Sequence, residues 1–97
     1  MRISSAQCRA ARALLGWSQD ELAAASSVAT ATIATFETGK RLPYERTLED
    51  IHAALAQAGV IFIDSNGEGP GVRLTKAKFH ADSAARAGAA LRKLGKT

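Results

Sequence analysis

The sequence has a single cysteine, two prolines and only five aromatic residues among its 97 positions. One cysteine forms no disulfide within the chain and supplies no cysteine cluster for zinc. No apolar run approaches the roughly 20 residues that a membrane-spanning helix needs. The N-terminal residues also lack the apolar core of a signal peptide. We therefore expect a cytoplasmic protein that is held together by a core of small and aliphatic side chains.

Alanine accounts for 21 of the residues, and because alanine has the highest helix propensity, the composition favours a mainly helical fold. A chain of this length forms one domain with a modest core, so a homodimer is a reasonable expectation. Charge is uneven, since residues 1–48 carry net +2, residues 49–75 net −3 and residues 76–97 net +5. The overall +4 favours an anionic partner, but the C-terminal fifth carries more than its share.

Capping residues and glycines delimit four predicted helices. The first is capped by Ser4 or Ser5 and ends near residue 15, before Gly16. Ser18 and Glu21 have the spacing of a capping box, which begins the second helix. The remaining predicted boundaries are residues 19–25 for the second helix, 30–38 for the third, and a cap at Thr47 and an end at Gly59 for the fourth.

The pattern changes after the fourth helix. Residues 60–63 are β-branched and aromatic, residues 65–71 are rich in glycine, and residues 72–75 alternate apolar and polar, which together predict a β-hairpin. The first strand is apolar on both faces, and one small helical domain covers only one of them. We expect a second subunit to cover the other face and the open edge. The expected dimer interface consists of Val60, Ile61, Phe62, Ile63, Val72 and Leu74.

The C-terminal residues form a basic tail. A further helix is possible over residues 81–94, where Asp82 and Arg86 are four residues apart with the acid first. The apolar side of this segment is thin, and Gly88 interrupts it. Both an ordered helix and a solvated segment remain open, and so does a contact between the tail and DNA.

The stretch from Gly16 to Lys40 contains two short helices joined by a turn of three to four residues, the arrangement of a helix-turn-helix. Residues 7–63 resemble the DNA-binding domain of the lambda-repressor/Cro-like family, also called XRE-type regulators. The matching residues are Arg12, Leu14, Leu15, Gly16, Ser18, Gln19, Glu21, Leu22, Ala23, Val28, Thr32, Ile33, Phe36, Glu37, Gly39, Lys40, Arg41, Pro43, Thr47, Leu48, Ile51, Ala54 and Leu55.

The resemblance implies a mainly α fold of four to five helices that places its third helix in the major groove of double-stranded DNA. Gln19, at the start of the second helix, would hold a phosphate. Arg12 and Glu37 would form a buried ion pair between the first and third helices. The other residues that the resemblance assigns to DNA contact are Ala29, Thr30, Ala31, Thr32, Ala34, Thr35, Lys40, Arg41 and Arg46.

This sequence departs from the family on the face that would read the bases. The family often has Arg, Gln, Asn or Ser there, whereas this face is almost entirely alanine and threonine. None of these residues makes the bidentate contacts that read guanine or adenine most strongly. What is left is methyl contact with thymine, single hydroxyl hydrogen bonds and close approach to the groove floor. We expect moderate discrimination per half-site, with DNA shape and dimer spacing contributing much of it.

No other pattern indicates chemistry. His52 and His80 have no companion ligands at metal spacing, and no serine, cysteine or carboxylate has a plausible base partner. We therefore expect no enzyme activity, cofactor, metal or small-molecule ligand. Cys8 is interpreted as a small packing residue, and Trp17 and Tyr44 as packing rather than base-stacking residues.

The sequence thus predicts a helix-turn-helix domain over residues 1–59, a dimerisation hairpin over residues 60–76 and a basic, possibly helical tail over residues 77–97. The predicted function is a bacterial-type transcription regulator, a repressor that binds an inverted-repeat operator as a homodimer. Its half-sites would lie about one helical turn, roughly 34 Å, apart. The alternative is a protein-interaction module such as an antitoxin or antiactivator.

Overall fold

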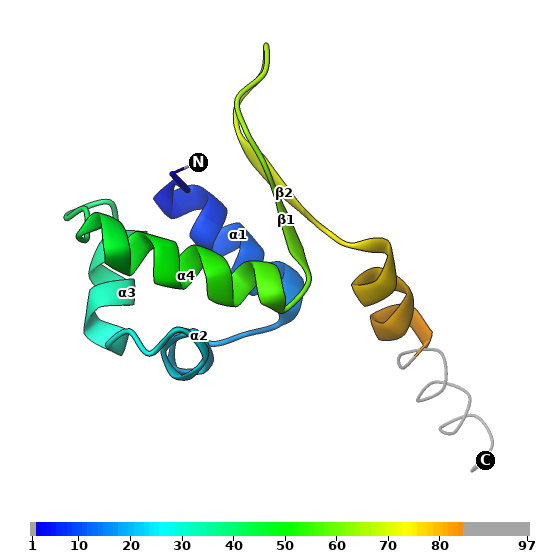
Figure 1. Cartoon of the computed structure of the whole chain (residues 1–97), viewed down its shortest axis with the longest axis horizontal. Coiled ribbons are helices and arrows are strands. Elements are labelled where there is room, and N and C mark those ends of the chain that lie inside the picture. The colour runs from blue at the N-terminus through cyan, green and yellow to red at the C-terminus, as the bar shows by residue number, and fades with distance from the viewer. Residues whose placement is uncertain (1, 85–97) are drawn as a thin grey trace.

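The computed structural model describes residues 2–84, which form a helical bundle with a β-hairpin on one side (Figure 1). A further helix occupies residues 76–84, up to the end of the described part. The mainly helical architecture with one small antiparallel sheet agrees with the prediction. The elements in order are α1 (Ser5–Leu15), α2 (Gln19–Ser26), α3 (Thr30–Glu37), α4 (Glu45–Gln57), β1 (Val60–Ile63) and β2 (Gly71–Leu74).

The first two helices begin at the predicted capping boxes. Ser4 caps α1 and Ser18 caps α2, and in both the side chain at the third helical position returns a hydrogen bond to the cap's own N–H. Gly16 ends α1 with a left-handed φ of 69°, a conformation that costs glycine little because it has no Cβ. Local sequence therefore accounts for these boundaries.

The starts of α3 and α4 differ from the prediction. Helix α4 begins at Glu45, with Tyr44 at the N-cap, so Thr47 lies inside the first turn and caps nothing. Thr30 likewise is the first residue of α3, because Ala29 occupies its N-cap. Neither N-cap provides a side-chain hydrogen bond. These two helices are positioned by the side chains they bury, Ile33 in α3 and Leu48 in α4, rather than by local caps.

One hydrophobic core joins all four helices to β1. Cys8 and Ala11 contribute small side chains from α1, and Ile3 is buried although it precedes the helix. No described helix is both long enough and apolar enough to cross a membrane. The core residues are Ile3, Cys8, Ala11, Leu22, Ile33, Phe36, Leu48, Ile51, Ala54, Leu55 and Val60.

The hairpin packs one face against the chain's own helices. In its register, Val60 pairs with Leu74 and Phe62 with Val72, so these four side chains share a face, and all four pack on the core. Gln7 of α1 fastens the hairpin, because its Nε2 donates to the carbonyl oxygens of Ile63 (3.3 Å) and Gly71 (3.0 Å).

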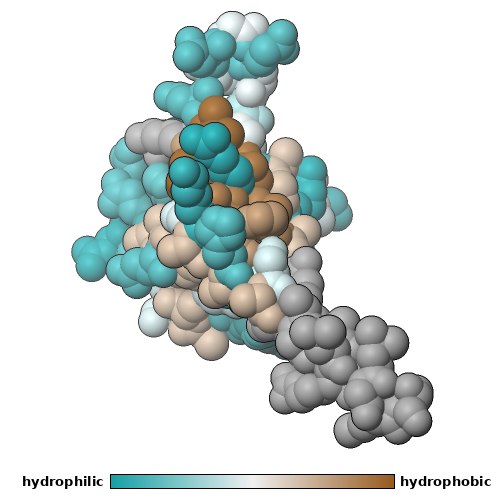
Figure 2. Space-filling view, turned by 90° about the vertical axis from the view of Figure 1, so that its right-hand side faces the viewer, coloured by the Kyte–Doolittle hydropathy of each residue, from teal (hydrophilic) through white to brown (hydrophobic). Residues whose placement is uncertain are grey.

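The opposite face of the hairpin points away from the helices. Ile61 and Ile63 are 38% and 40% exposed on it, and Arg73 lies opposite Ile61 in the register. Figure 2 shows this side of the molecule, where hydrophobic side chains gather along the hairpin. The structure therefore corrects part of the expected dimer interface, because Val60 is 3% exposed and belongs to the core of its own chain.

The helix after the hairpin begins five residues earlier than the predicted residue 81. The Thr75 hydroxyl oxygen accepts the Lys78 N–H at 3.1 Å and caps it. Lys78 packs against Gly59, where an added Cβ would lie 2.7 Å from the lysine Cβ. Asp82 pairs with Lys78 at 3.1 Å, whereas its predicted partner Arg86 and the rest of the predicted helix lie outside the described residues.

Candidate nucleic-acid interface

Helices α2 and α3 are joined by a turn of three residues. Ser27 ends α2 with a left-handed φ of 58°, and the Thr30 hydroxyl then donates to Asp20 Oδ1 at 2.9 Å, which ties the start of α3 to the start of α2. Because Ile33, Phe36 and Glu37 are the buried side chains of α3, the helix turns its other side outward. The outward side carries alanines and threonines, and we call Ala29, Ala31, Thr32, Ala34 and Thr35 the reading face.

The threonine hydroxyls of this region are mostly used inside the chain. The Thr35 hydroxyl donates to the Ala31 carbonyl oxygen at 2.9 Å, and that of Thr38 donates to the Thr35 carbonyl oxygen at 2.7 Å. Within the described residues, the Thr32 hydroxyl has no hydrogen-bond partner. The reading face therefore presents mainly methyl groups.

A groove of about 490 Å³ runs along the reading face. It brings together five of the residues assigned to DNA contact, and its other side is the loop that follows α3, with Leu42, Pro43 and Tyr44. Tyr44 is 84% exposed, so its interpretation as a packing residue is wrong, whereas Trp17 does pack against the core. The five residues are Ala29, Ala31, Thr32, Thr35 and Arg41.

The other basic residues of the region are exposed but do not line the groove. Lys40 lies at the end of the turn after α3, and Arg46 is on the first turn of α4. With Arg41 they place three positive charges in one short segment that follows the reading face. Such a segment is suited to phosphate contacts, which position a protein on DNA without reading its sequence.

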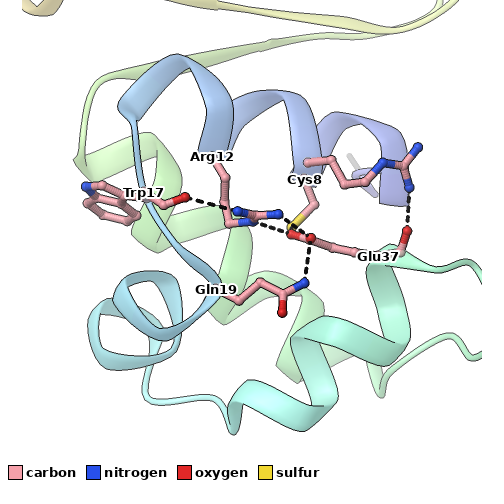
Figure 3. Close-up of polar contacts among 6 residues, drawn as sticks. Cys8, Arg12, Trp17, Gln19 and Glu37 are labelled. Carbon is pink, nitrogen blue, oxygen red and sulfur yellow. Dashed lines mark hydrogen bonds and ion pairs between the residues drawn. The ribbon is translucent and has the colours of Figure 1, made fainter.

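Gln19 lies differently from the other assigned residues. Its Nε2 donates to Glu37 Oε1 at 3.0 Å, so the amide is turned toward the junction of α1, α2 and α3 (Figure 3). One N–H of the amide is thereby used inside the chain, which leaves the second N–H as the donor that the side chain offers to another group.

Glu37 is the centre of a polar cluster at that junction (Figure 3). Arg12 donates to both of its carboxylate oxygens, with Nε–Oε2 at 2.7 Å and Nη2–Oε1 at 2.6 Å. The Cys8 thiol donates to Oε2 at 3.2 Å, and Arg9 donates to the Glu37 carbonyl oxygen. Arg12 also donates to the Trp17 carbonyl oxygen at 3.0 Å. The cluster therefore connects α1 to the start of α2 and to the end of α3.

The ionisation of the cluster follows from these contacts. Burial raises the pKa of the Glu37 carboxyl, but the hydrogen bonds from Arg12, Gln19 and Cys8 outweigh it and hold the pKa below its usual value. Burial, reinforced by the hydrogen bond to Glu37, raises the pKa of the Cys8 thiol to about 12. At neutral pH the cluster thus contains a carboxylate, a guanidinium and a neutral thiol.

The lowered pKa of Glu37 predicts that acid weakens its contribution. A carboxyl whose pKa is lower in the folded than in the unfolded chain stabilises the fold above the unfolded value, about 4.3 for glutamate. That stabilisation is lost as the pH falls through the folded pKa. We expect the native protein to exceed Glu37→Gln in free energy of unfolding at neutral pH and to lose this advantage below about pH 4. Urea titrations across this range measure it, and a constant difference would contradict the prediction.

Two contacts at this site were not foreseen from the sequence. The hydrogen bond from Gln19 to Glu37 joins positions 18 residues apart, and that from Gln7 to Gly71 joins positions 64 residues apart. The capping box signalled only the local partner of Gln7, namely Ser4. No local pattern indicates the distant ones.

Comparison with known proteins adds one finding. The helix-turn-helix family model matches residues 9–56, which contain α2, α3, the loop after α3 and most of α1 and α4. The hairpin and the helix at residues 76–84 lie outside the match. No curated protein matches the chain.

Proposed function

Residues 9–56 of this chain belong to the lambda-repressor/Cro-like (XRE-type) helix-turn-helix family, and we propose from this that the protein is a transcriptional repressor that binds an inverted-repeat operator as a homodimer. The family consists of DNA-binding regulatory domains and is not a family of enzymes. Repression would be steric, because a dimer on the operator covers the promoter. The proposed place of action is the cytoplasm, where bacterial DNA lies.

One observation carries the DNA-binding part of the proposal. The reading face of α3 is turned outward beside a groove, and the segment that follows it carries Lys40, Arg41 and Arg46 on exposed positions. A helix that enters the major groove needs a small exposed face flanked by phosphate-binding groups. No described residue outside α3 and this segment lines that groove except those of the α2–α3 turn and of α4.

The outward face of the hairpin supports the homodimer. Ile61 and Ile63 leave an apolar surface on a two-stranded sheet with open edges. A second copy of the same face covers it with a symmetric contact, and a symmetric dimer matches a symmetric operator. Four further residues of the expected interface, Val60, Phe62, Val72 and Leu74, are packed on the chain's own core. In the proposal they support the contact from beneath.

A gel shift against DNA from the region upstream of the protein's own gene tests the function, with a shuffled duplex of the same composition as control. A regulator shifts the upstream duplex at protein concentrations that leave the shuffled one free. A protein-interaction module gives no sequence-dependent shift even at low salt, and that result would reject the proposal.

The basic segment after α3 gives a quantitative prediction. In Lys40→Ala/Arg41→Ala, binding should weaken about equally on specific and shuffled duplexes, because phosphate contacts carry no sequence information. The slope of log affinity against log salt should become shallower by about 2, close to one unit for each lost contact. Fluorescence anisotropy from low to moderate salt measures both.

Arg2→Ala is the matched control, because it also removes a positive charge but lies against α4 beside Glu49. Its salt slope should equal that of the native protein. If the double variant keeps the native slope as well, Lys40 and Arg41 do not contact phosphates.

A further inference from the structure

We propose that the protein reads its operator chiefly through the 5-methyl groups of thymine, which pack against the methyl groups of the reading face. This inference rests on the proposed DNA-binding function and specifies what that function recognises. Its structural basis is the distribution of hydrogen-bond donors along α3.

The donors on this helix are already used. The hydroxyls of Thr30 and Thr35 donate to Asp20 Oδ1 and to the Ala31 carbonyl oxygen, each at 2.9 Å. A hydroxyl has one proton to donate, so these two groups offer none to a base without breaking an internal hydrogen bond. Each threonine still carries a Cγ2 methyl, and the alanines between them present Cβ methyls. Thr32 is the one reading-face threonine with a free hydroxyl among the described residues.

The longer side chains nearby do not compensate. The Gln19 amide is held by Glu37 at 3.0 Å, and Arg41 lines the groove from the loop beyond the helix rather than from its reading face. The face therefore lacks the paired donors that read the O6 and N7 of guanine, or the amide that reads adenine. Base pairs that display only acceptors or amino groups offer this helix little to distinguish them.

Thymine is the one base that presents a methyl group in the major groove. Small side chains allow the helix to approach the groove floor, where methyl groups pack within about 4 Å of one another. Removing such a methyl from water contributes about fourfold in affinity. Two or three such contacts in each half-site supply the moderate discrimination that the sequence predicts.

The direct test removes the methyl group from the DNA. A duplex that binds the protein is selected from a random pool and resynthesised with deoxyuridine for thymidine in both half-sites, which deletes the methyl groups and keeps every hydrogen-bonding group. We expect the affinity to fall more than tenfold, at about fourfold per methyl. The control duplex carries the same number of deoxyuridines outside the half-sites and should bind like the parent.

Two variants of one residue separate the methyl from the hydroxyl on the protein side. Thr35→Ser keeps the hydroxyl and deletes the methyl, whereas Thr35→Val keeps the shape and deletes the hydroxyl. We expect Thr35→Val to bind the selected duplex like the native protein. Thr35→Ser should bind it about fourfold more weakly and should lose less when the duplex contains deoxyuridine. Thermal melts of both variants confirm that they are folded at the assay temperature.

The outcomes distinguish this inference from the function beneath it. If no duplex is enriched from the pool, the DNA-binding function fails and the inference fails with it. If a duplex is enriched but deoxyuridine in its half-sites does not weaken binding, the function stands and methyl reading is wrong. If Thr35→Val loses affinity and Thr35→Ser does not, the hydroxyl reads the operator and the inference is likewise overturned.

Discussion

Glu37→Ala is expected to lower the free energy of unfolding by about 3 kcal/mol, because it leaves a largely buried guanidinium without its counter-charge. The Arg12 side chain is 20% exposed and donates to both Glu37 oxygens. The variant also removes the acceptor of Cys8 and of Gln19. Since small domains have a total stability of roughly 5–15 kcal/mol, this loss is large. Urea denaturation followed by far-ultraviolet circular dichroism measures it.

Two further variants show whether the effect comes from the cluster. Glu49→Ala removes an exposed carboxylate from α4 and should cost less than about 0.5 kcal/mol. Arg12→Met/Glu37→Leu replaces the pair by apolar groups of similar volume and should recover much of the loss, because no uncompensated charge is left. If Glu37→Ala and Glu49→Ala are equally stable, the cluster does not hold the three helices together.

Ile61→Glu/Ile63→Glu is expected to convert the proposed dimer to a monomer and to weaken binding to the full operator about 100-fold. The two carboxylates would face each other across the contact between hairpins. A dimer gains this factor because the second half-site is bound at a high effective concentration. Sedimentation equilibrium measures the mass, and anisotropy on full and half operators measures affinity. Binding to a single half-site should change little.

A matched variant adds the same charge elsewhere on the hairpin. Ser65→Glu/Asn66→Glu lies in the exposed loop and should remain dimeric. Phe62 is unsuitable for this test, because its ring packs edge-on against His52 at 4.6 Å and a charge there would disturb the fold. If the isoleucine variant stays dimeric, the subunit contact lies on another surface or on the basic tail.

The residues that were predicted well are those whose signals are local. The two capping boxes, the glycine end of α1 and the turn-rich stretch between the strands each depend on neighbours within a few residues. The family resemblance added the order of the helices, and the family match over residues 9–56 confirms it. The starts of α3 and α4 were missed because tertiary burial of Ile33 and Leu48 outweighs side-chain capping there.

The candidate interface was predicted as a set of residues but not as a surface. The sequence indicated which residues belong near DNA, yet it did not show that Arg41 lines a groove with the reading face while Lys40 and Arg46 do not. It also gave no sign that Tyr44 is exposed or that Gln19 turns toward Glu37. Each of these depends on the path of the chain between residues distant in sequence.

By itself the sequence determined the helical class, the order of the elements, the helix-turn-helix and the alanine and threonine character of its third helix. These follow from propensity, capping and apolar periodicity, which act over one or two turns. Only the tertiary structure decided which face of the hairpin is covered and which threonine hydroxyls are already bonded. It also decided that one carboxylate holds three helices together. Burial and hydrogen-bond partners are properties of the packed chain, because the groups that compete for each donor meet only after folding.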